Sequence, residues 1–411
     1  MATSATITLE PTSAPAPAAQ QTPHTERTTY WDMVEYLRDF LGADVQGVVP
    51  RVVKRAIHSA LRQIPNEHNW SYFYTHGRVN LNAPQDDGTI AFDLTGGAQE
   101  RMVTLTGATW PAWAASSGYL RINNVIYQID RRVSSTVLVL DPVLTPTEDI
   151  AALTEYTLFS DTYLLPEDFI SMDRGLNEDN WYGMSWVHPR EWLEITRYVD
   201  SFSNSPRFFS ITGSPDVPGR MALRVFPYPD TARSLDFLYK RRPRTATIDQ
   251  YTTGTVTVTA GSTTVSGSQT AFTSAMEGSV IRLSTDAVNL PSGLDGDSPF
   301  SVERTVKTVT NSTSLEVDEA IDVAHTGVKY RLSDPVDVED GAMLEAFYRL
   351  SEMHAGIQRK HKDRMVLEKA YTDAMILAKE ADCRVFQVRV VGQQRGFRQR
   401  LADMPSGPDV S

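Results

Sequence analysis

Cysteine is almost absent from this chain. Among its 411 residues, only Cys383 carries a thiol. A single cysteine excludes an intrachain disulfide framework and a zinc site built from several thiolates. The chain therefore has to fold by packing alone, and we expect it to be made in a reducing cytoplasm.

Long apolar runs and positive charge are also scarce. No stretch approaches the roughly 18–20 apolar residues of a membrane span, and residues 1–21 lack the pattern of a secretion signal. Lysine and arginine number 39 against 51 aspartates and glutamates, which gives a net charge of −12. General nucleic-acid binding needs clustered cations. The excess of acidic residues instead suits a surface that DNA can slide past without binding. We also expect no membrane partner.

Motifs of catalysis are missing as well. The sequence contains no phosphate-binding loop, no nucleophile elbow and no His-Glu-x-x-His zinc pair. His354 and His361 could share a helix face, but a polar break between them favours solvated histidines over a metal site. Asp286, Asp295 and Asp297 could offer oxygens to calcium, yet the full loop spacing is absent and a solvated turn is favoured. We expect no enzyme activity, no metal and no cofactor.

One acidic and aromatic segment resembles a sugar site. Carboxylates beside tryptophans can bind or cleave glycans, and this leaves a glycan-binding protein as an alternative. The carboxylates have no motif spacing, however, so the favoured interpretation is that the aromatic side chains anchor a subunit contact. The carboxylates are Asp173, Glu178 and Asp179, and the aromatic residues are Trp181, Tyr182, Trp186 and Trp192.

Helical periodicity occurs at both ends of the chain. Apolar residues recur at helical spacing over 31–41, 53–64 and 344–351, and again in a stripe from Val366 to Ala381 that includes Ala374 and Leu377. Arg359–Asp363 is a polar break between the last two runs. Because neither terminal pair can bury its stripe alone, we predict one bundle formed by the N- and C-terminal helices.

Two β-rich tracts between these ends resemble each other. Gly88-Thr89-Ile90 matches Gly254-Thr255-Val256, Leu105 matches Val265, and each tract closes with a Tyr-x-Leu strand at Tyr156 or Tyr330. Further along, Ile129 is aligned with Val302 and Leu140 with Val317. The pattern predicts one small antiparallel barrel or sandwich used twice, with chance similarity of Thr/Val-rich strands as the alternative. Between the tracts, Met221–Phe226 and Ser234–Tyr239 are predicted to form a hairpin.

The predicted fold class is therefore α+β, a helical bundle with two similar β modules inserted. The predicted segments are an N-terminal arm that is disordered or orders on a neighbour, the first bundle helices, β module 1, a middle region with a short helix and a hairpin, β module 2, the last bundle helices, and a basic C-terminal arm. Their boundaries are 1–28, 29–76, 77–165, 166–250, 251–333, 334–383 and 384–411.

Two stretches resemble a known protein family. The first is the motif Gly-Thr-Val-x-Val-x-x-Gly-Ser-x-x-Val-x-Gly from Gly254 to Gly267, which resembles a small β module of phage tail and connector proteins. The second runs from Trp192 through Pro206–Gly213 and Leu223–Asp230 to Leu235–Pro243. Together they resemble head-to-tail connector (portal-binding adaptor) proteins of tailed double-stranded DNA bacteriophages, over about Trp31 to Arg400.

This resemblance implies a structural subunit of the virion, located at the head-tail junction. Such proteins form a ring, usually a dodecamer, that binds the portal protein above and tail or nozzle proteins below while double-stranded DNA passes through the lumen. Another tail or baseplate protein, or a glycan-binding tail protein, are the alternatives.

The C-terminal arm is the candidate contact to the portal. It contains no acidic residue between Arg384 and Arg400, and the alternation over Arg384–Val391 predicts an edge strand. We hypothesise that this arm docks on the portal by strand pairing and charge. A solvated basic tail and a DNA-contacting arm are the alternatives. The arginines of the arm are Arg384, Arg389, Arg395, Arg398 and Arg400.

Overall fold

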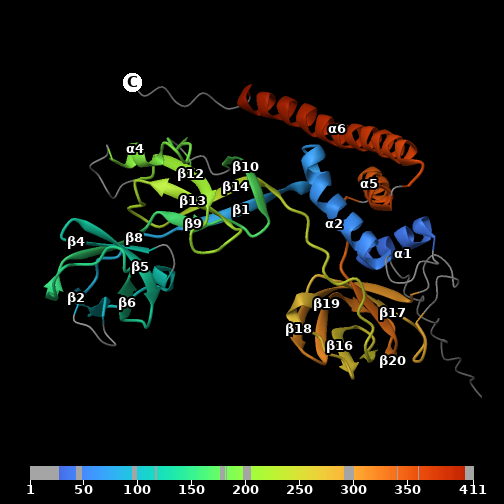
Figure 1. Cartoon of the computed structure of the whole chain (residues 1–411), viewed down its shortest axis with the longest axis horizontal. Helices are drawn as coiled ribbons and strands as arrows, with labels where there is room; N and C mark the ends of the chain where they lie inside the picture. Colours follow the sequence, from blue (N-terminus) through green and yellow to red (C-terminus); the bar gives the residue numbers. More distant parts are fainter. Residues whose placement is uncertain are drawn as a thin grey trace, which may run out of the picture. The chain divides into compact units, whose positions relative to one another are not determined.

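The chain folds into two compact units. The computed structural model describes residues 27–42, 49–94, 100–115, 118–175, 181, 183–197, 205–290, 300–339, 341–359 and 361–402. Unit 1 combines Met1–Glu67 with Arg244–Ser411, and unit 2 is His68–Pro243 (Figure 1). The fold is α+β, with helices and antiparallel sheets that include a near-closed barrel and a half-barrel.

Helices at both ends of the chain belong to unit 1. Periodicity correctly predicts helices in all four runs, which are α1 (Tyr30–Leu41), α2 (Val49–Glu67), α5 (Ala342–Arg359) and α6 (Arg364–Ala402). Helix α1 begins at Thr29 in a reciprocal capping box with Asp32, which satisfies backbone donors of the first turn.

The helices of the two chain ends contact one another. Tyr36 of α1 lies edge-on to Tyr348 of α5, with ring centroids 4.6 Å apart. Nε2 of His354 on α5 lies 2.9 Å from Oε1 of Gln63 on α2. Where α5 meets α6, a Cβ on Gly356 would come within 2.5 Å of a terminal methyl of Leu367, so a larger residue there would force the Leu367 side chain to shift.

The apolar stripe predicted for α6 is only partly buried. Ala374, Met375 and Ala378 are buried, whereas Val366 and Leu377 are 64% and 63% exposed. The prediction that Val366 and Leu377 share a buried stripe with Ala374 is therefore wrong. The small residue Ala378 and the adaptable Met375 fill the buried face instead.

Module 2, in unit 1, is one seven-stranded antiparallel sheet. Its strand order is β20-β15-β16-β19-β18-β17-β21. The bounds are β15 (Thr255–Val258), β16 (Ser262–Ser268), β17 (Val280–Leu283), β18 (Val302–Asn311), β19 (Ser314–Ile321), β20 (His325–Val328) and β21 (Tyr330–Ser333), with a 3-10 turn η3 (Ser274–Met276).

Module 1, in unit 2, is a second seven-stranded sheet with the equivalent order β7-β2-β3-β6-β5-β4-β8. The strand order thus confirms the internal repeat. The bounds are β2 (Thr89–Asp93), β3 (Met102–Thr106), β4 (Gly118–Ile122), β5 (Val125–Arg132), β6 (Val137–Leu140), β7 (Ile150–Thr154) and β8 (Tyr156–Ser160), with η2 (Ala112–Ala115) in the place of η3.

The repeat extends to individual hydrogen bonds. Gly88 and Gly254 have φ values of +84° and +82°, a backbone region that favours glycine. The hydroxyl of Tyr156 donates to the carbonyl of Asp87, just before the first glycine, at 2.5 Å. The hydroxyl of Tyr330 donates to the carbonyl before the second glycine at 2.7 Å. The last strand of each module is therefore held by the same hydrogen bond, from a tyrosine hydroxyl to the carbonyl before the glycine.

The strand pairing corrects two of the residue equivalences. Leu105 faces Ile90 just as Gly267 faces Val256, so Leu105 corresponds to Gly267 and not to Val265. Likewise, Ile129 pairs with Leu140 and Val306 with Val317, so Ile129 corresponds to Val306 and not to Val302. Shifts of two or four residues keep every side chain on its face, and the apolar pattern alone therefore did not fix the register.

Unit 2 contains two further sheets. One has the order β1-β14-β10, and the other has the order β11-β12-β13-β9. The bounds are β1 (Tyr74–Leu81), β9 (Thr162–Leu164), β10 (Phe169–Gly175), β11 (Ser185–Trp186), β12 (Phe208–Gly213), β13 (Met221–Phe226) and β14 (Arg233–Arg241), with α4 (Trp192–Arg197) and η1 (Ser71–Phe73).

The predicted hairpin between β13 and β14 does not form. Both strands exist, but β13 pairs with β12 and β9, whereas β14 pairs with β1 and β10. Pro227 and Pro229 lie in the connection, and proline cannot donate to a strand ladder. The connection therefore carries the chain from one sheet to another.

Candidate functional site

The predicted aromatic anchors do not form one surface cluster. Trp181 is partly buried against the core between the two smaller sheets, where its Nε1 donates to the carbonyl of Asp236 at 2.8 Å. Trp192 is buried in a separate small cluster with Val187 and Phe226. The interface hypothesis placed these two side chains on the surface, but the folded unit uses them internally.

Among the predicted anchors that the structure describes, Trp186 remains accessible. Its side chain is 57% exposed and lies edge-on to His188. Tyr182, Glu178 and Asp179 lie outside the described residues, while Asp173 is exposed on β10. Of the residues in the sugar-site interpretation, the structure therefore describes Asp173 and the three tryptophans.

The five C-terminal arginines all lie on a long helix. Helix α6 continues through Arg384 and on to Ala402, so the edge strand predicted for Arg384–Val391 is wrong. No proline occurs between Arg364 and Ala402, and helix extension adds one hydrogen bond per residue once a helix has formed. The side chains of the five arginines lie outside the described residues.

The candidate metal ligands remain apart. His354 hydrogen-bonds Gln63, whereas His361 stacks on Phe40. Asp286 accepts from the backbone N–H of Val288 in a local turn, and Asp295 and Asp297 lie outside the described residues. Within the described part of the chain, no group of three or more His, Cys, Asp or Glu side chains is placed to hold a metal ion.

Module 1 has a polar hollow of about 570 Å³ on its surface. Arg121 and Glu155 are among its lining residues, and the hydroxyl of Thr157 accepts from Arg121 Nη2 at 3.2 Å. Its lining contains no histidine, serine or cysteine. The full lining is made of Asp86, Gly88, Thr89, Arg121, Asn123, Asn124, Glu155, Tyr156 and Thr157.

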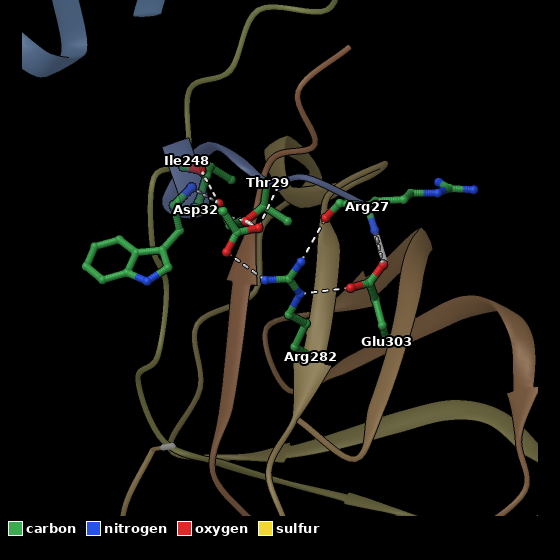
Figure 2. Close-up of polar contacts among 8 residues, drawn as sticks. Arg27, Thr29, Asp32, Ile248, Arg282 and Glu303 are labelled. Atoms are coloured by element: carbon green, nitrogen blue, oxygen red, sulfur yellow. Dashed lines mark hydrogen bonds and ion pairs between the residues drawn. The ribbon is translucent and has the colours of Figure 1, made fainter. Parts of the chain in front are cut away.

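An extended polar site lies on the outer face of module 2, around Arg282. Figure 2 shows its guanidinium between two carboxylates and a backbone carbonyl. Nη1 donates to Asp32 and Nε to Glu303, each at 2.8 Å, and Nη2 donates to the carbonyl of Arg27 at 2.8 Å. One side chain of β17 thus binds the segment that leads into α1.

Charge and burial act in opposite directions at Arg282. Its side chain is only 13% exposed, and burial disfavours the charged form. Hydrogen bonds and Coulomb attraction to Asp32 and Glu303 outweigh this effect and raise the pKa of Arg282. The guanidinium is therefore a fixed positive charge that selects an acidic partner on the docked segment.

Backbone contacts complete this docking of residues 27–32, which we call the N-terminal latch. Glu303 accepts from the backbone N–H of Arg27, and the N–H of Tyr30 donates to the carbonyl of Asp334 at 2.7 Å. Thr29 also forms a β-bridge with Pro335. Trp31 lies under the guanidinium of Arg331, 4.8 Å from ring centroid to Cζ. The site combines strand-like pairing, ion pairs and a cation–π contact.

A buried carboxylate lies behind the latch. Asp334 has no exposed surface. Its oxygens accept from Ser279 Oγ and from the backbone N–H groups of Thr247 and Ile248, all at 2.7–2.8 Å, and Arg244 lies 3.2 Å away. This carboxylate joins β21 to the segment that enters module 2, and it fixes the strand end on which the latch rests.

The equivalent face of module 1 is also docked, but by aromatic rings. Tyr119 on β4 stacks on Phe159 on β8, and Phe159 stacks on Tyr228 with centroids 4.1 Å apart. Tyr228 comes from the connection between β13 and β14. By strand register, Phe159 occupies the position of Ser333, whose hydroxyl accepts from the N–H of Trp31. Both modules therefore offer the same sheet face to another segment of the chain.

Sequence reasoning did not identify Arg282, Asp32 or Asp334. The available signals were Arg282 itself, matched with Arg121 in the repeat, and the spacing Thr29-x-x-Asp32, which is that of a capping box.

Comparison with known proteins gives no further identification. No protein-family model, curated protein or solved structure matches this chain significantly. Among the described helices, none is long and apolar enough to cross a membrane.

Proposed function

We propose that this chain is a structural head-to-tail adaptor of a tailed-phage virion. In this proposal, copies of the chain form a ring, twelvefold by the family resemblance, below the portal. The ring joins the head to tail or nozzle proteins, and double-stranded DNA passes through its lumen. The subunit acts by burying interfaces and is not an enzyme.

The observation that supports this proposal best is the duplicated module. Two sheets of identical strand order are held to the rest of the chain through the same outer face. Such repetition builds a scaffold that presents surfaces, and it matches the tract whose motif resembles connector proteins. An acidic chain with net charge −12 also suits a lumen that repels the DNA backbone.

The proposal assigns the helices to the portal side. We propose that α1, α2, α5 and α6 form the predicted bundle and that the C-terminal extension of α6 reaches the portal. Its arginines then pair with acidic portal groups, a contact whose strength depends on ionic strength. The exposed Trp186 is the proposed anchor toward a tail protein, because tryptophan is favoured at interfaces.

The first test is the position of the chain in the particle. Electron microscopy of purified virions should show this chain as a ring between portal and tail. Density at the distal tail tip or baseplate would reject the adaptor role and favour the glycan-binding or baseplate alternatives.

The second test separates the portal contact from folding. Deleting residues 384–411 should abolish binding of the purified chain to purified portal. Its thermal unfolding midpoint should stay unchanged, and its circular dichroism should lose only the helical signal of residues 384–402. A matched deletion of residues 403–411 retains all five arginines and should bind normally. Unchanged binding by the longer deletion would reject the docking arm.

A further inference from the structure

Helix α6 has a second apolar face that α5 does not cover. Met365, Val366, Ile376 and Leu377 are 83%, 64%, 51% and 63% exposed. At about 100° per residue, Ile376 lies three turns beyond Met365, and Leu377 lies three turns beyond Val366. The four side chains therefore form two pairs on one stripe. This stripe faces away from the buried Ala374, Met375 and Ala378.

Opposite charges occupy the centre of the same stripe. Lys369 and Asp373 are both exposed, and each lies at an angle between those of the apolar pairs. The stripe therefore has apolar ends and one charge of each sign at its centre, and a partner stripe that runs in the opposite direction can match both charges. Exposed apolar patches of this kind mark interaction sites more often than isolated exposed residues do.

We propose that this stripe binds the same stripe of a second copy of the chain, with the two α6 helices antiparallel. The two-fold axis crosses the pair at the height of residue 371. Two residues, one from each copy, then lie at the same height when their numbers sum to 742. Lys369 then lies level with the partner's Asp373. Met365 packs beside the partner's Ile376, and Val366 packs beside the partner's Leu377, each within one residue of the same height.

Charge decides between the antiparallel and the parallel arrangement. In a parallel two-fold pair, each Lys369 would meet the partner's Lys369, and each Asp373 would meet the partner's Asp373, so like charges would repel. The antiparallel pair replaces both repulsions with two symmetric ion pairs. A two-fold contact of this kind is isologous, which is the commonest arrangement of homodimers.

The size of the stripe sets the expected affinity. From Met365 to Leu377 it spans about 18 Å of helix at 1.5 Å per residue. The contact is therefore smaller than a standard interface of about 800 Å² per partner, and we expect a dissociation constant in the micromolar range. The dimer concerns the free subunit and goes beyond the adaptor role, so its test needs no portal.

The oligomeric state of the full chain tests the proposal. Sedimentation velocity from about 5 to about 200 µM should show a monomer that converts to a dimer as concentration rises. Lys369→Glu alone and Asp373→Lys alone should each raise the dissociation constant by about tenfold or more. The double variant should restore it, because each new glutamate meets a new lysine of the partner.

Two controls make the result specific. Lys307→Glu makes the same charge change at an exposed site on β18 and should leave the dissociation constant unchanged. Ile376→Asp, another exposed position, should abolish the dimer while circular dichroism stays the same. A chain that stays monomeric over the whole range, or a double variant as weak as the single ones, overturns the proposal.

Cross-linking reports the orientation directly. A mixture of nitrogen-15-labelled and unlabelled chains, treated with a carbodiimide, should give a mixed-label amide between Lys369 and Asp373. A dimer that lacks this product and loses no affinity on charge reversal would place the contact elsewhere and overturn the antiparallel pairing.

Discussion

The two modules share one scaffold but are docked by different chemistry. On module 2, Arg282 lies among Asp32, Glu303 and a backbone carbonyl, and it holds the N-terminal latch by charge. On module 1, the equivalent face holds Tyr228 by ring stacking on Phe159. Strand order and the register of the docking strands are the same, so the side chains on these strands account for the different docking chemistry.

Cross-strand neighbours explain why equivalent arginines behave differently. Arg282 pairs across the strands with Glu303, whereas Arg121 at the same register position pairs with Ile126. A carboxylate beside Arg282 fixes its guanidinium and leaves donors for a second acidic group. The repeated fold therefore determines where a segment docks, and single cross-strand positions determine which segment is accepted.

The largest expected effect comes from the buried carboxylate of module 2. Its equivalent in module 1 is Ser160, whose hydroxyl donates to Thr162. Asp334→Ala should lower the free energy of unfolding of unit 1 by about 3–5 kcal/mol, because it leaves Arg244, the buried hydroxyl of Ser279 and two backbone N–H groups without their acceptor. Ser160→Ala should cost about 1 kcal/mol.

Both losses can be measured by hydrogen exchange during urea denaturation. Exchange of residues 279–283 and 330–334 reports the loss caused by Asp334→Ala, and exchange of residues 156–160 reports the loss caused by Ser160→Ala. Equal losses in the two modules would show that Asp334 is no more than an ordinary strand-end residue.

The aromatic docking of module 1 comes next in size. Tyr228→Ala removes a buried ring from Phe159 and should destabilise unit 2 by about 3 kcal/mol. Tyr228→Phe keeps the ring and should cost less than about 1 kcal/mol. Thermal unfolding of the two variants provides the measurement, and a similar loss for both would assign the effect to the hydroxyl instead of the stack.

How far the sequence predicts this molecule depends on the range of the interaction. Helical spacing and polar breaks are local, and they located α1, α2, α5 and α6. Repeated glycines and closing tyrosines revealed the duplicated module. Strand partners are not local, so the hairpin between β13 and β14 was predicted wrongly although both strands exist.

The docking sites could not be predicted for the same reason. Arg282 and Asp32 are 250 residues apart, and nothing in either local pattern indicates the contact. The tryptophans of the middle region were predicted as surface anchors from residue type alone, but Trp192 is buried in a core and Trp181 packs, partly buried, against another. Residue type indicates that an aromatic side chain buries area, and only the fold indicates whether it does so inside the unit or against a partner.

The arginine pair tests the comparison most directly. Arg282→Met should destabilise the latch by about 2–3 kcal/mol, because Glu303 loses its partner while largely buried. Arg121→Met in module 1 should cost less than about 1 kcal/mol. Hydrogen exchange of residues 27–41 should rise in the first variant and stay unchanged in the second. Equal protection in both would mean that backbone pairing, not charge, holds the latch.

The smallest expected effect is a dependence of unit 1 on pH. Burial lowers the pKa of His354 and His325 below the ordinary value of 6.5, and burial together with Arg62 and Lys54 lowers that of His58. The unfolded chain binds a proton near 6.5, whereas the folded chain resists it until lower pH. Stability is thus complete above about pH 7 and falls as the pH drops through 6.5 toward 5.

His354→Gln separates this effect from general acid denaturation. Glutamine keeps a polar group beside Gln63 but does not titrate, so the melting temperature should fall less steeply between about pH 7 and pH 5. The exposed His188 gives a matched control as His188→Gln, which should retain the original slope. A slope that His354→Gln leaves unchanged would assign the acid sensitivity of unit 1 to its carboxylates, with the ion pairs of the latch as the first candidates.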